Sequence, residues 1–497
     1  MTSTELPSAP VTHTDRLFIG GEWVKPSSDS TLDVIDSHSE NVYFQVAEAR
    51  AADVDRAVGA AREAFDNGPW PRMTHTERAD YLRRLAEGIR SRSDAVTQIW
   101  PRETGVIEAH AANDAPDAAN RFEYYANLAN DYPFEEPAMP TAGGAFGLLS
   151  REPVGVVGAI VPWNGPLFLA TAKLAPALLA GCTVVLKMSS EAPGEGYIIA
   201  EAAREAGLPP GVLNVITAER EVSELLVKDS RVDKIAFTGS TTTGRRIAAI
   251  CSERVARYTL ELGGKSAAII LDDVDIAATA TQLALDEVFI TGQVCSSLTR
   301  VIVGRNQHDE LVDAIASTFA GINVGDPFDP DSQMGPLAGS RQRDRVEGYI
   351  AKGVAEGAKL VTGGGRPKHL DRGFYVEPTL FANVDNRSTI AQEEIFGPVL
   401  SVIAFDSVDH AVELANDTIY GLNASVFTND IEQMRSIARR LRSGTVGHNA
   451  YRTDFGVCFG GFKQSGIGRE GGREGLAPYL ETKFTIFEEY PSGYGPS

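Results

Sequence analysis

The sequence predicts an α/β protein built from two doubly wound lobes and a small additional β element. Apolar, β-rich runs alternate with amphipathic helical patterns from about residue 154, and a second alternating series begins beyond residue 271. Strands that alternate with helices form parallel sheets with helices on both faces. The chain of 497 residues is also too long for one hydrophobic core. Two α/β lobes are therefore expected.

The first series predicts the elements of one parallel sheet. Three amphipathic helical patterns precede it and can pack on that sheet, at residues 52–66, 76–91 and 112–130. Its strand-like runs are residues 155–161, 183–187, 212–216, 234–237 and 266–271. Another helical pattern, at residues 197–206, ends in a Gly-Leu-Pro-Pro-Gly sequence that is a typical helix stop.

The second series predicts a second lobe of the same class. Its helical patterns are residues 309–320, 341–356 and 431–441, and its strand-like runs are residues 359–362 and 399–405. Residues 132–150 and 483–490 are expected to be extended strands with little local core. Such strands often pair with a neighbouring subunit, so we expect a homodimer or a homotetramer.

Composition and charge exclude several classes of function. A hydrophobic content of 43% and a charged content of 23% are ordinary for a globular protein. The net charge of −21 predicts neither nucleic-acid nor membrane partners, because it repels polyanions and anionic lipid. The first 14 residues lack the basic and apolar regions of a signal peptide, so a cytoplasmic location is expected. The four cysteines form no C-x-x-C pair, which predicts reduced thiols and no metal site.

Cys295 and Glu261 are the candidate reacting groups. Cys295 lies in a Gly-Gln-Val-Cys-Ser-Ser sequence, where small neighbours let a substrate approach the backbone. Glu261 lies in a Leu-Glu-Leu-Gly-Gly-Lys sequence, and the strand-like run at 266–271 suggests that its carboxylate is at a strand end. A thiol and a nearby carboxylate are a nucleophile and a base for covalent catalysis. The alternative for each residue alone is a buried structural cysteine and a surface glutamate.

A second motif is typical of phosphate binding. Residues 237–244 read Phe-Thr-Gly-Ser-Thr-Thr-Thr-Gly and join a strand to a helix, so the backbone at Gly239, Ser240 and Gly244 can face a phosphate. The motif lacks the lysine of a nucleoside-triphosphate loop. Lys187 ends a predicted strand at the sheet edge where dinucleotides bind. The alternatives are a plain turn and a snorkelling surface lysine.

Taken together, the motifs resemble those of the aldehyde dehydrogenase superfamily, of the NAD(P)-dependent hydrolytic type. They occur in that family's order from Pro162 to Glu470: Pro162-Trp163-Asn164, Lys187, Phe237-Thr238-Gly239-Ser240, Leu260-Glu261-Leu262-Gly263-Gly264, Gly292-Gln293-Val294-Cys295, Glu394-Ile395-Phe396-Gly397-Pro398, and Phe459-Gly460-Gly461 to Gly468-Arg469-Glu470. The resemblance implies a Rossmann-like dinucleotide-binding domain at residues 1–130 and 152–260. It also implies a catalytic domain at 261–462 and oligomerisation strands at 131–151 and 475–497.

The resemblance implies a role for each candidate catalytic residue. Cys295 as thiolate attacks an aldehyde, and the Asn164 amide and the Cys295 backbone N–H stabilise the oxyanion. Hydride transfer leaves a thioester, which water activated by Glu261 hydrolyses to the acid. Lys173 matches a lysine that helps to ionise the thiol or orients water, and Glu470 a second carboxylate that shares protons. From the residues alone, the alternatives are that Asn164 caps a helix and that Lys173 is one charge on a solvated helix face.

The resemblance also implies a cofactor site for NAD, with NADP as the alternative. Its residues are Trp163, Lys187, Ser190, Gly239, Ser240, Gly244, Leu262, Glu394 and Phe396. Glu394 and Phe396 match the pair that positions the nicotinamide ribose and ring, although a phenylalanine before Gly-Pro is often only core packing. Ser190 replaces a common acidic residue that rejects a 2′-phosphate, while Glu191 beside it restores a negative charge. Met188 replaces a usual proline at this turn.

Several departures from the family pattern bear on substrate and rate. Gly165, Leu169 and Ala172 lie where the family often has bulky aromatics, and their spacing places them on one helix face. We therefore expect a wide tunnel and a preference for bulky apolar or aromatic aldehydes. Ile290 replaces a usual asparagine near the nucleophile, and Cys458, expected to be a buried thiol, replaces a proline.

Two other functions stay open at this stage. A CoA-acylating relative passes its thioester to coenzyme A and needs no hydrolytic base, so the presence of Glu261 argues against it. A catalytically silent member with a structural or binding role is the second alternative, because a fold does not guarantee chemistry. Cys295, Glu261 and Asn164 together disfavour that alternative, and Ile290 keeps it open.

Overall fold

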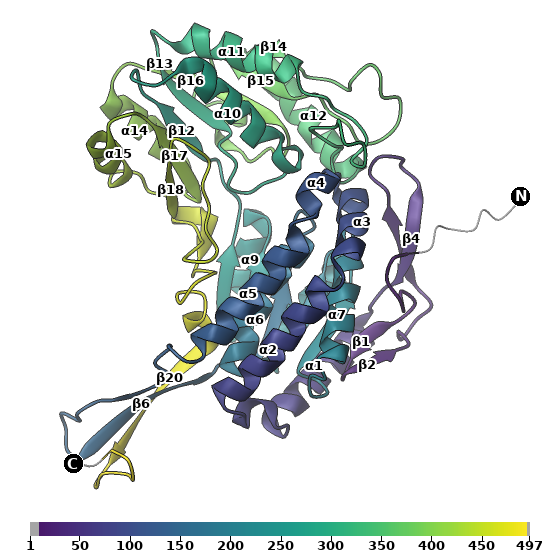
Figure 1. Ribbon diagram of the computed structural model, residues 1–497, viewed down its shortest axis with the longest axis vertical. Helices are drawn as coiled ribbons and strands as arrows, with labels where there is room; N and C mark the ends of the chain where they lie inside the picture. The colour runs from purple at the N-terminus through teal and green to yellow at the C-terminus, as the bar shows by residue number, and fades with distance from the viewer. Residues whose placement is uncertain (1–8, 495–497) are drawn as a thin grey trace, which may run out of the picture.

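The computed structural model describes residues 9–494 and has two lobes, one above the other in Figure 1. Residues 1–8 and 495–497, the outer ends of two predicted domain ranges, lie outside the described residues. One sheet runs through each lobe, and a thin three-stranded sheet projects to the lower left of the view. Both lobes are α/β, which confirms the predicted fold class.

The sheet of the first lobe has eight strands and a parallel centre. Its order is β19-β11-β10-β7-β8-β9-β1-β2, with antiparallel pairs only at the two edges. Its central strands β7 to β10 are buried along their whole length, as is usual when helices cover both faces. The bounds are β1 Leu17–Ile19, β2 Glu22–Val24, β7 Val156–Ile160, β8 Thr183–Met188, β9 Leu213–Thr217, β10 Lys234–Thr238, β11 Arg257–Glu261 and β19 Gly466–Ile467.

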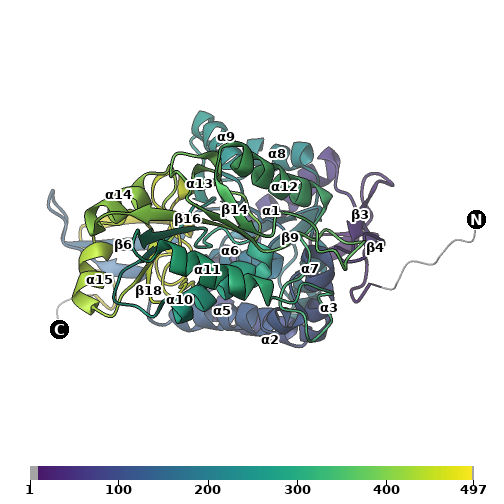
Figure 2. The same ribbon diagram turned by 90° about the horizontal axis from the view of Figure 1, so that it is seen from above.

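Helices cover both faces of this sheet. Figure 2 shows α8 and α9 on one side of the lobe and α2 and α5 on the other. Helix α6 is almost entirely apolar and buried, so it forms the middle of the layer between the sheet and α5. The bounds are α1 Ala51–Asp66, α2 His75–Arg90, α3 Ser93–Thr104, α4 Glu108–Ala111, α5 Asp114–Leu128, α6 Pro166–Ala180, α7 Gly194–Glu205, α8 Arg220–Lys228 and α9 Thr241–Glu253.

The sheet of the second lobe has seven strands in the order β14-β15-β16-β13-β12-β17-β18, and only β14 is antiparallel. Its strands are β12 Ala267–Ile270, β13 Arg300–Gly304, β14 Lys359–Thr362, β15 Thr379–Ala382, β16 Val399–Phe405, β17 Asn423–Phe427 and β18 Thr445–His448. Its helices are α10 Ile276–Val288, α11 His308–Ala320, α12 Ser340–Ala355, α13 Thr389–Gln392, α14 Val408–Asn416 and α15 Ile431–Ala438.

The projecting sheet pairs two segments that are distant in sequence. Strand β6 (Phe146–Pro153) lies between β5 (Glu135–Pro137) and β20 (Leu480–Phe487), and β20 exposes Phe484 and Ile486. A separate hairpin joins β3 (Thr31–Ile35) and β4 (Val42–Ala47). Short 3₁₀ turns are η1 Trp70–Arg72, η2 Phe289–Gly292, η3 Lys463–Ser465 and η4 Ala477–Tyr479. Among residues 9–494, no helix combines the length and the apolar character that a bilayer span requires.

The predicted helices and strands match the structure closely, with one assignment to correct. The run at residues 266–271, predicted as a strand of the first sheet, is β12 in the centre of the second. Glu261 ends β11, a strand that the sequence analysis missed because charged residues stand at both of its ends. The carboxylate is therefore at a strand end, but of the preceding strand. The domain boundaries stay predictions, and β19 lies in a segment that they leave unassigned.

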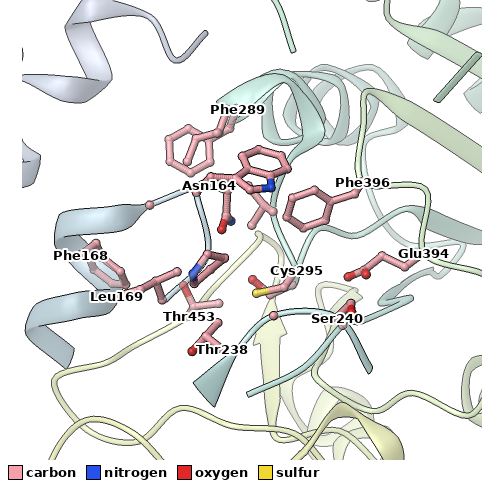
Figure 3. Close-up of a pocket in the computed structure, with 18 of the residues that line it drawn as sticks. Asn164, Phe168, Leu169, Thr238, Ser240, Phe289, Cys295, Glu394, Phe396 and Thr453 are labelled. Atoms are coloured by element: carbon pink, nitrogen blue, oxygen red, sulfur yellow. The ribbon is translucent and has the colours of Figure 1, made fainter. Parts of the chain in front are cut away.

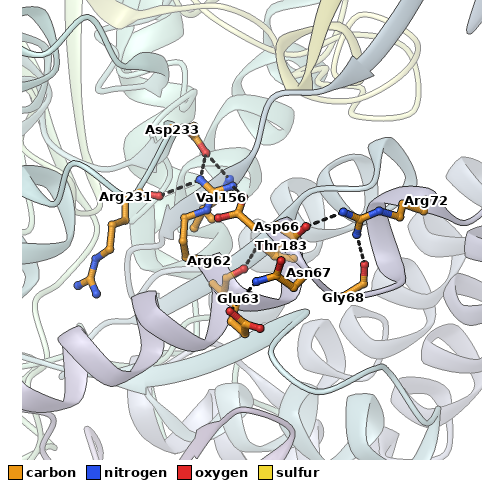
Figure 4. A network of polar contacts seen from close by, with 11 residues as sticks. Arg62, Glu63, Asp66, Asn67, Gly68, Arg72, Val156, Thr183, Arg231 and Asp233 are labelled. Atoms are coloured by element: carbon orange, nitrogen blue, oxygen red, sulfur yellow. Dashed lines mark hydrogen bonds and ion pairs between the residues drawn. The ribbon is translucent and has the colours of Figure 1, made fainter.

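A polar network ties α1 to the amino edge of the first sheet (Figure 4). The Asp233 carboxylate accepts from the Val156 backbone N–H at 2.7 Å and from Arg62 at 2.8 Å, and Arg62 also pairs with Asp66. A Cβ on Gly155, which has φ of +131°, would stand 1.8 Å from Asp233 Oδ2. Only glycine fits there, because the strand start and the carboxylate are in direct contact.

Candidate active site

The predicted nucleophile opens into a cavity of about 930 Å³ between the two lobes. Eight of the predicted site residues line this cavity: Trp163, Asn164, Gly239, Ser240, Leu262, Cys295, Glu394 and Phe396. In Figure 3 the Cys295 sulfur lies between Asn164 above and Ser240 below, with Glu394 and Phe396 to one side and Phe168 and Leu169 to the other. The other six predicted residues lie outside the lining: Lys173, Lys187, Ser190, Gly244, Glu261 and Glu470.

The Cys295 thiol is protonated at neutral pH in this environment. Burial raises its pKa to about 12, and the carboxylates of Glu394 and Glu261 add to that effect. The Ser296 hydroxyl and the Cys295 backbone N–H oppose it only weakly. Because the thiolate is the reactive form, catalysis requires a proton acceptor or a positive charge to arrive near the sulfur.

The loop before Cys295 has an unusual backbone. Ile290, Thr291 and Gly292 all have left-handed φ values, of 47°, 55° and 67°. This conformation is rare for β-branched residues and is retained only where surrounding contacts hold it. Gln293 supplies such contacts: it is fully buried, its amide nitrogen donates to the Thr104 and Ile290 carbonyls, and its oxygen accepts from the Ala338 N–H. Gln293 belongs to the Gly-Gln-Val-Cys motif, but the motif alone does not predict this structural role.

Asn164 is tied to the nucleophile loop. Its side-chain amide donates to the Gln293 carbonyl at 2.9 Å. The helix-cap alternative is wrong, because the N-cap of α6 is Gly165 and no side chain caps that helix. In Figure 3 the amide of Asn164 and the sulfur of Cys295 point into the same space. Asn164 is therefore placed to donate to an oxygen bound next to the sulfur.

Glu261 is buried without a hydrogen-bond partner. Its exposed fraction is 2%, and within residues 9–494 neither carboxylate oxygen has a partner. Burial and the neighbouring Glu470 raise its pKa well above the usual value, against the opposing charges of Lys173 and Arg469. A Cβ on Gly460 would stand 2.6 Å from Glu261 Oε1, so the carboxylate packs directly on the glycine backbone. A buried, unpartnered carboxyl with a raised pKa is typical of a catalytic base or acid.

Lys173 and Glu470 form a buried ion pair. The Lys173 Nζ lies 2.5 Å from Glu470 Oε1 and donates to Thr238 Oγ1 at 2.6 Å. Lys173 is fully buried, so the alternative of a charge on a solvated helix face is wrong. Its charge opposes the rise in the pKa of Glu261, and it is not among the main influences on the pKa of Cys295. Its direct contacts are thus with Glu470 and Thr238 and not with the thiol.

Glu394 and Phe396 lie opposite the nucleophile. Glu394 Oε1 accepts from the Gly264 N–H at 3.1 Å, and burial raises its pKa to about 7. Phe396 lines the cavity and meets the Trp163 ring edge-on at 5.4 Å, so its role is not core packing. A Cβ on Gly264 would stand 2.2 Å from the Cys295 carbonyl oxygen. Glycine at 264 thus lets the backbone after β11 approach the nucleophile loop.

Four predicted cofactor residues lie at the carboxyl edge of the first sheet. Lys187 is the penultimate residue of β8 and is buried, which lowers its pKa to about 8 and shows that it does not snorkel at the surface. Ser240 is the N-cap of α9 and accepts from the Thr243 N–H at 3.3 Å. Gly244 makes room for Leu262, since a Cβ there would stand 2.5 Å from that side chain. Ser190 donates to the Glu191 carboxylate at 3.3 Å.

The cavity and this edge fit a dinucleotide. The N-terminus of α9 faces the cavity through Gly239 and Ser240, an arrangement that suits a diphosphate. The Trp163 and Phe396 rings and the Glu394 carboxylate line the same cavity, a combination that suits an aromatic ring and a ribose. Among residues 9–494, no group of three or more His, Cys, Asp or Glu side chains could hold a metal ion.

Aromatic side chains form the other wall of the cavity. Its aromatic members include Trp100, Phe168, Phe289, Phe455 and Phe459. Phe168 meets Phe455 edge-on at 4.7 Å, and Phe455 stacks on Phe459 at 4.0 Å. Sequence reasoning missed this wall, because its residues come from distant segments and only the fold brings them together.

The three predicted tunnel residues differ in position. Gly165 and Leu169 line the cavity, whereas Ala172 is buried away from it. A Cβ on Gly165 would meet nothing closer than 3.9 Å, so glycine leaves open space there. Cys458, predicted to be a buried thiol, is partly exposed, and all four cysteines are free. The cavity therefore has open space at Gly165, and aromatic side chains from other segments line it.

Comparison with known proteins defines the class. The model of the aldehyde dehydrogenase family matches residues 23–485, and the chain belongs to that family. Geranial dehydrogenase of Castellaniella defragrans is 45% identical over 468 residues, which are 94% of this chain and 97% of that protein. The crystal structure of a Mycobacterium tuberculosis aldehyde dehydrogenase with NAD+ has a TM-score of 0.93 and 46% identity, covering 97% of this chain and 99% of the other.

A third similar protein was solved with an aldehyde. A variant of aldehyde dehydrogenase C from Pseudomonas syringae, in complex with NAD+ and octanal, has a TM-score of 0.93 and 40% identity. The match covers 98% of this chain and 99% of that structure. The family resemblance on the motifs, the α/β fold and the class of enzyme are therefore confirmed.

Proposed function

We propose that this chain oxidises bulky apolar or aromatic aldehydes to carboxylic acids, with NAD+ as the electron acceptor. The observation that carries the proposal is one cavity in which Cys295 stands between an amide donor, a nicotinamide-compatible pocket and an aromatic wall. The amide donor supports the proposed chemistry, the pocket at Glu394 and Phe396 supports the cofactor, and the aromatic wall supports the substrate class.

In the first half-reaction Cys295 attacks the aldehyde carbon as a thiolate. The carbonyl π bond opens and a tetrahedral oxyanion forms, to which the Asn164 amide and the Cys295 backbone N–H donate. When bound, NAD+ supplies the acceptor for the hydride that leaves the aldehyde carbon. The oxyanion then re-forms its C=O bond, and the substrate stays on the cysteine as a thioester.

In the second half-reaction Glu261 accepts a proton from water, and the hydroxide adds to the thioester carbonyl. The C–S bond then breaks, which releases the carboxylic acid and leaves Cys295 as the thiolate. The carboxylate needs free oxygens for this work, and both oxygens of Glu261 lack hydrogen-bond partners in residues 9–494. Lys173 favours the charged form of Glu261, whereas the neighbouring Glu470 favours its protonated form. The hydrolytic base argues for a released acid and against acyl transfer to coenzyme A.

Preference for NAD+ over NADP+ rests on Glu191. Its carboxylate lies next to Lys187 and Ser190, and hydrogen bonds from Ser189 together with the charge of Arg341 hold its pKa below the usual value. A negative charge at this place repels a 2′-phosphate. Two similar aldehyde dehydrogenases were solved with NAD+, which supports the same choice here.

The substrate class rests on the aromatic wall and on the space at Gly165. Apolar chains gain about 0.8 kcal/mol for each buried methylene, so a long apolar cavity selects longer aldehydes. The names of two similar proteins, a geranial dehydrogenase and an enzyme solved with octanal, are consistent with that class. A catalytically silent role suits this site less well. The hydrogen bonds of Gln293 hold the loop at Ile290 in its left-handed conformation, so the replacement at position 290 does not leave the loop without support.

We also propose a homodimer or homotetramer that uses the projecting sheet. Strand β20 exposes Phe484 and Ile486, and β6 pairs with it over its full length, far from both cores. Exposed apolar side chains on a long thin sheet are typical of a subunit interface.

A screen of aldehydes with NAD+ and NADP+ in parallel tests the proposed function. Acetaldehyde, octanal, geranial and benzaldehyde are compared by kcat/KM, with Cys295→Ala as the control that should lose all oxidation. We expect kcat/KM to rise at least about 10-fold from acetaldehyde to octanal, as several buried methylenes imply. A steady fall from short to long aldehydes would refute the apolar substrate class, and equal use of both cofactors would refute the role of Glu191.

A further inference from the structure

A buried carboxylate behind the cavity holds the two loops on which the reaction depends. Glu287 lies in the last turn of α10 and has an exposed fraction of 1%. Its Oε2 accepts from the Ser297 hydroxyl at 2.6 Å. Its Oε1 accepts from the Val399 backbone N–H at 3.1 Å. Each oxygen of one carboxylate therefore holds a different segment of the chain.

The two segments carry the groups that must meet in hydride transfer. Ser297 follows Cys295 by two residues, and Val399 follows directly on the loop that carries Glu394 and Phe396. The loops also touch at their backbones, since a Cβ on Gly292 would stand 2.4 Å from the Gly397 carbonyl carbon. Glu287 itself does not line the cavity. It acts on the site only through the segments that it joins.

A buried lysine complements this carboxylate. Lys265 is 2% exposed, and within residues 9–494 its Nζ has no hydrogen-bond partner. Burial and Arg300 lower its pKa to about 7, whereas Glu287 and Glu394 favour its charged form. Burial raises the pKa of Glu287 to about 8, and its hydrogen bond with Ser297, then Lys265 and Val399, oppose the shift.

Such an arrangement is costly for stability and useful for geometry. Burial disfavours the charged forms of both groups, as their shifted pKa values show, so their mutual attraction contributes little to stability. Two directional hydrogen bonds from one rigid helix, however, fix the distance between two loops more narrowly than apolar packing does. The feature is therefore better explained by placement than by stability.

We propose that Glu287 is a positioning residue, which sets the distance between the Cys295 sulfur and the nicotinamide pocket at Glu394 and Phe396. The inference rests on the proposed function, since it assigns a role within that reaction. Hydride transfer requires near-contact geometry, and a displacement of about 1 Å costs about 10²-fold in rate. Acylation of Cys295 by an activated ester needs the thiol and the oxyanion donors but no nicotinamide pocket.

The test compares two activities of the same protein. NAD+-dependent oxidation of octanal and hydrolysis of p-nitrophenyl acetate without cofactor are measured for the wild type, Glu287→Ala and Glu287→Gln. In Glu287→Ala we expect kcat for oxidation to fall about 10²-fold while kcat for ester hydrolysis stays within about threefold. The KM for octanal should change little. Glutamine should restore most of the loss, because its amide oxygen can accept from the Val399 N–H while its NH₂ donates to the Ser297 hydroxyl.

Two further variants separate placement from stability. Ser297→Ala removes only one of the two hydrogen bonds to Glu287, so its loss of activity should be smaller, and oxidation should again fall more than ester hydrolysis. This variant keeps the test valid even if Glu287→Ala fails to fold. Asp53→Ala is the matched control: Asp53 is also buried and accepts from a serine hydroxyl, Ser27 at 2.6 Å, and from a backbone N–H, Arg50 at 2.9 Å. It should lower Tm and leave the ratio of the two activities unchanged.

The possible failures are distinguishable. Proportional loss of both activities in Glu287→Ala and Ser297→Ala, or no loss in either, would overturn the positioning role while the wild type still oxidises octanal. A wild type that hydrolyses the ester but oxidises no aldehyde would overturn the proposed function, and the positioning role with it.

Discussion

Charged side chains at the two edges of the first sheet differ in whether their hydrogen bonds are satisfied. At the amino edge, the Asp233 carboxylate accepts from the Val156 N–H and from Arg62, within the network of Figure 4. At the carboxyl edge, Glu261 is buried with neither oxygen hydrogen-bonded in the described residues, and burial lowers the pKa of Lys187 to about 8. Both edges belong to the same strands, so the fold alone does not explain the contrast.

The contrast separates groups that stabilise the structure from groups that react. A carboxylate with its hydrogen bonds satisfied contributes to the free energy of unfolding and has no oxygen left for a substrate. A buried carboxylate without partners destabilises the fold, but its oxygens are free to accept a hydrogen bond from water or a proton transferred during the reaction. Unpartnered buried charges at the end of parallel strands therefore indicate the reacting side.

The largest expected effect concerns Glu261 at the reacting edge. Glu261→Gln should give a burst of about one equivalent of reduced cofactor and then stall, with steady turnover reduced by about 10² to 10⁴, because the thioester forms but loses its base. Stopped-flow absorbance of NADH measures both phases. Asp233→Asn, an equally small change at the other edge, should keep full steady turnover. Unchanged turnover in Glu261→Gln would remove it from hydrolysis.

The next effect concerns the protonation of Cys295. Its pKa of about 12 lies above the usual value, so the reactive thiolate is the minor form at neutral pH and grows as pH rises. Without cofactor, the rate of alkylation by iodoacetamide should increase about tenfold per pH unit from about pH 7 to pH 10. Glu394→Gln removes a charge that raises this pKa and should speed alkylation at fixed pH. A plateau below pH 8 would contradict the raised pKa.

A smaller effect is expected at the amino edge. Asp233→Ala leaves the Val156 N–H and Arg62 without their shared acceptor and should lower the free energy of unfolding by about 1–3 kcal/mol, with kcat/KM unchanged. Urea denaturation measures it. Asp66→Ala, which removes the exposed partner of Arg62, should cost less than about 1 kcal/mol. Equal losses of unfolding free energy in Asp233→Ala and Asp66→Ala would show that the hydrogen bond from the Val156 N–H contributes little to stability.

The smallest effect concerns backbone strain. Val255, between α9 and β11 at the amino edge, has φ of 55° and is 78% exposed, so Val255→Gly should stabilise the protein by about 1 kcal/mol without changing activity. Ile290 has a similar φ of 47° but is buried beside the cavity. Relief of strain there should alter kcat as well. Thermal unfolding and kcat of Val255→Gly and Ile290→Gly together decide whether the two strained residues differ in function.

Local patterns were sufficient to predict the α/β class and many, but not most, of the individual elements. Helices α1, α2, α11 and α12 begin and end within two residues of the predicted ranges, because amphipathic periodicity is read from the helix itself. Strand β12 was placed in the wrong sheet, and β11 was missed, as were β13, β15, β17 and β18 of the second sheet. An apolar run in the sequence does not indicate which sheet it will join, so the position of β12 could not be predicted from it. Strand β11 is short and has charged residues at both ends, so it lacks the apolar pattern of a buried strand.

The sequence by itself determined the two α/β lobes, the motifs and the residue types of the chemistry: a thiol, a carboxylate, an amide and a phosphate-binding turn. Only the tertiary structure decided which charges stand alone. The raised pKa values of Cys295 and Glu261, the aromatic wall and the contacts of Glu287 depend on burial and on neighbours hundreds of residues away or in another lobe. Desolvation and contact between distant segments have no local signature, which is why these features required coordinates.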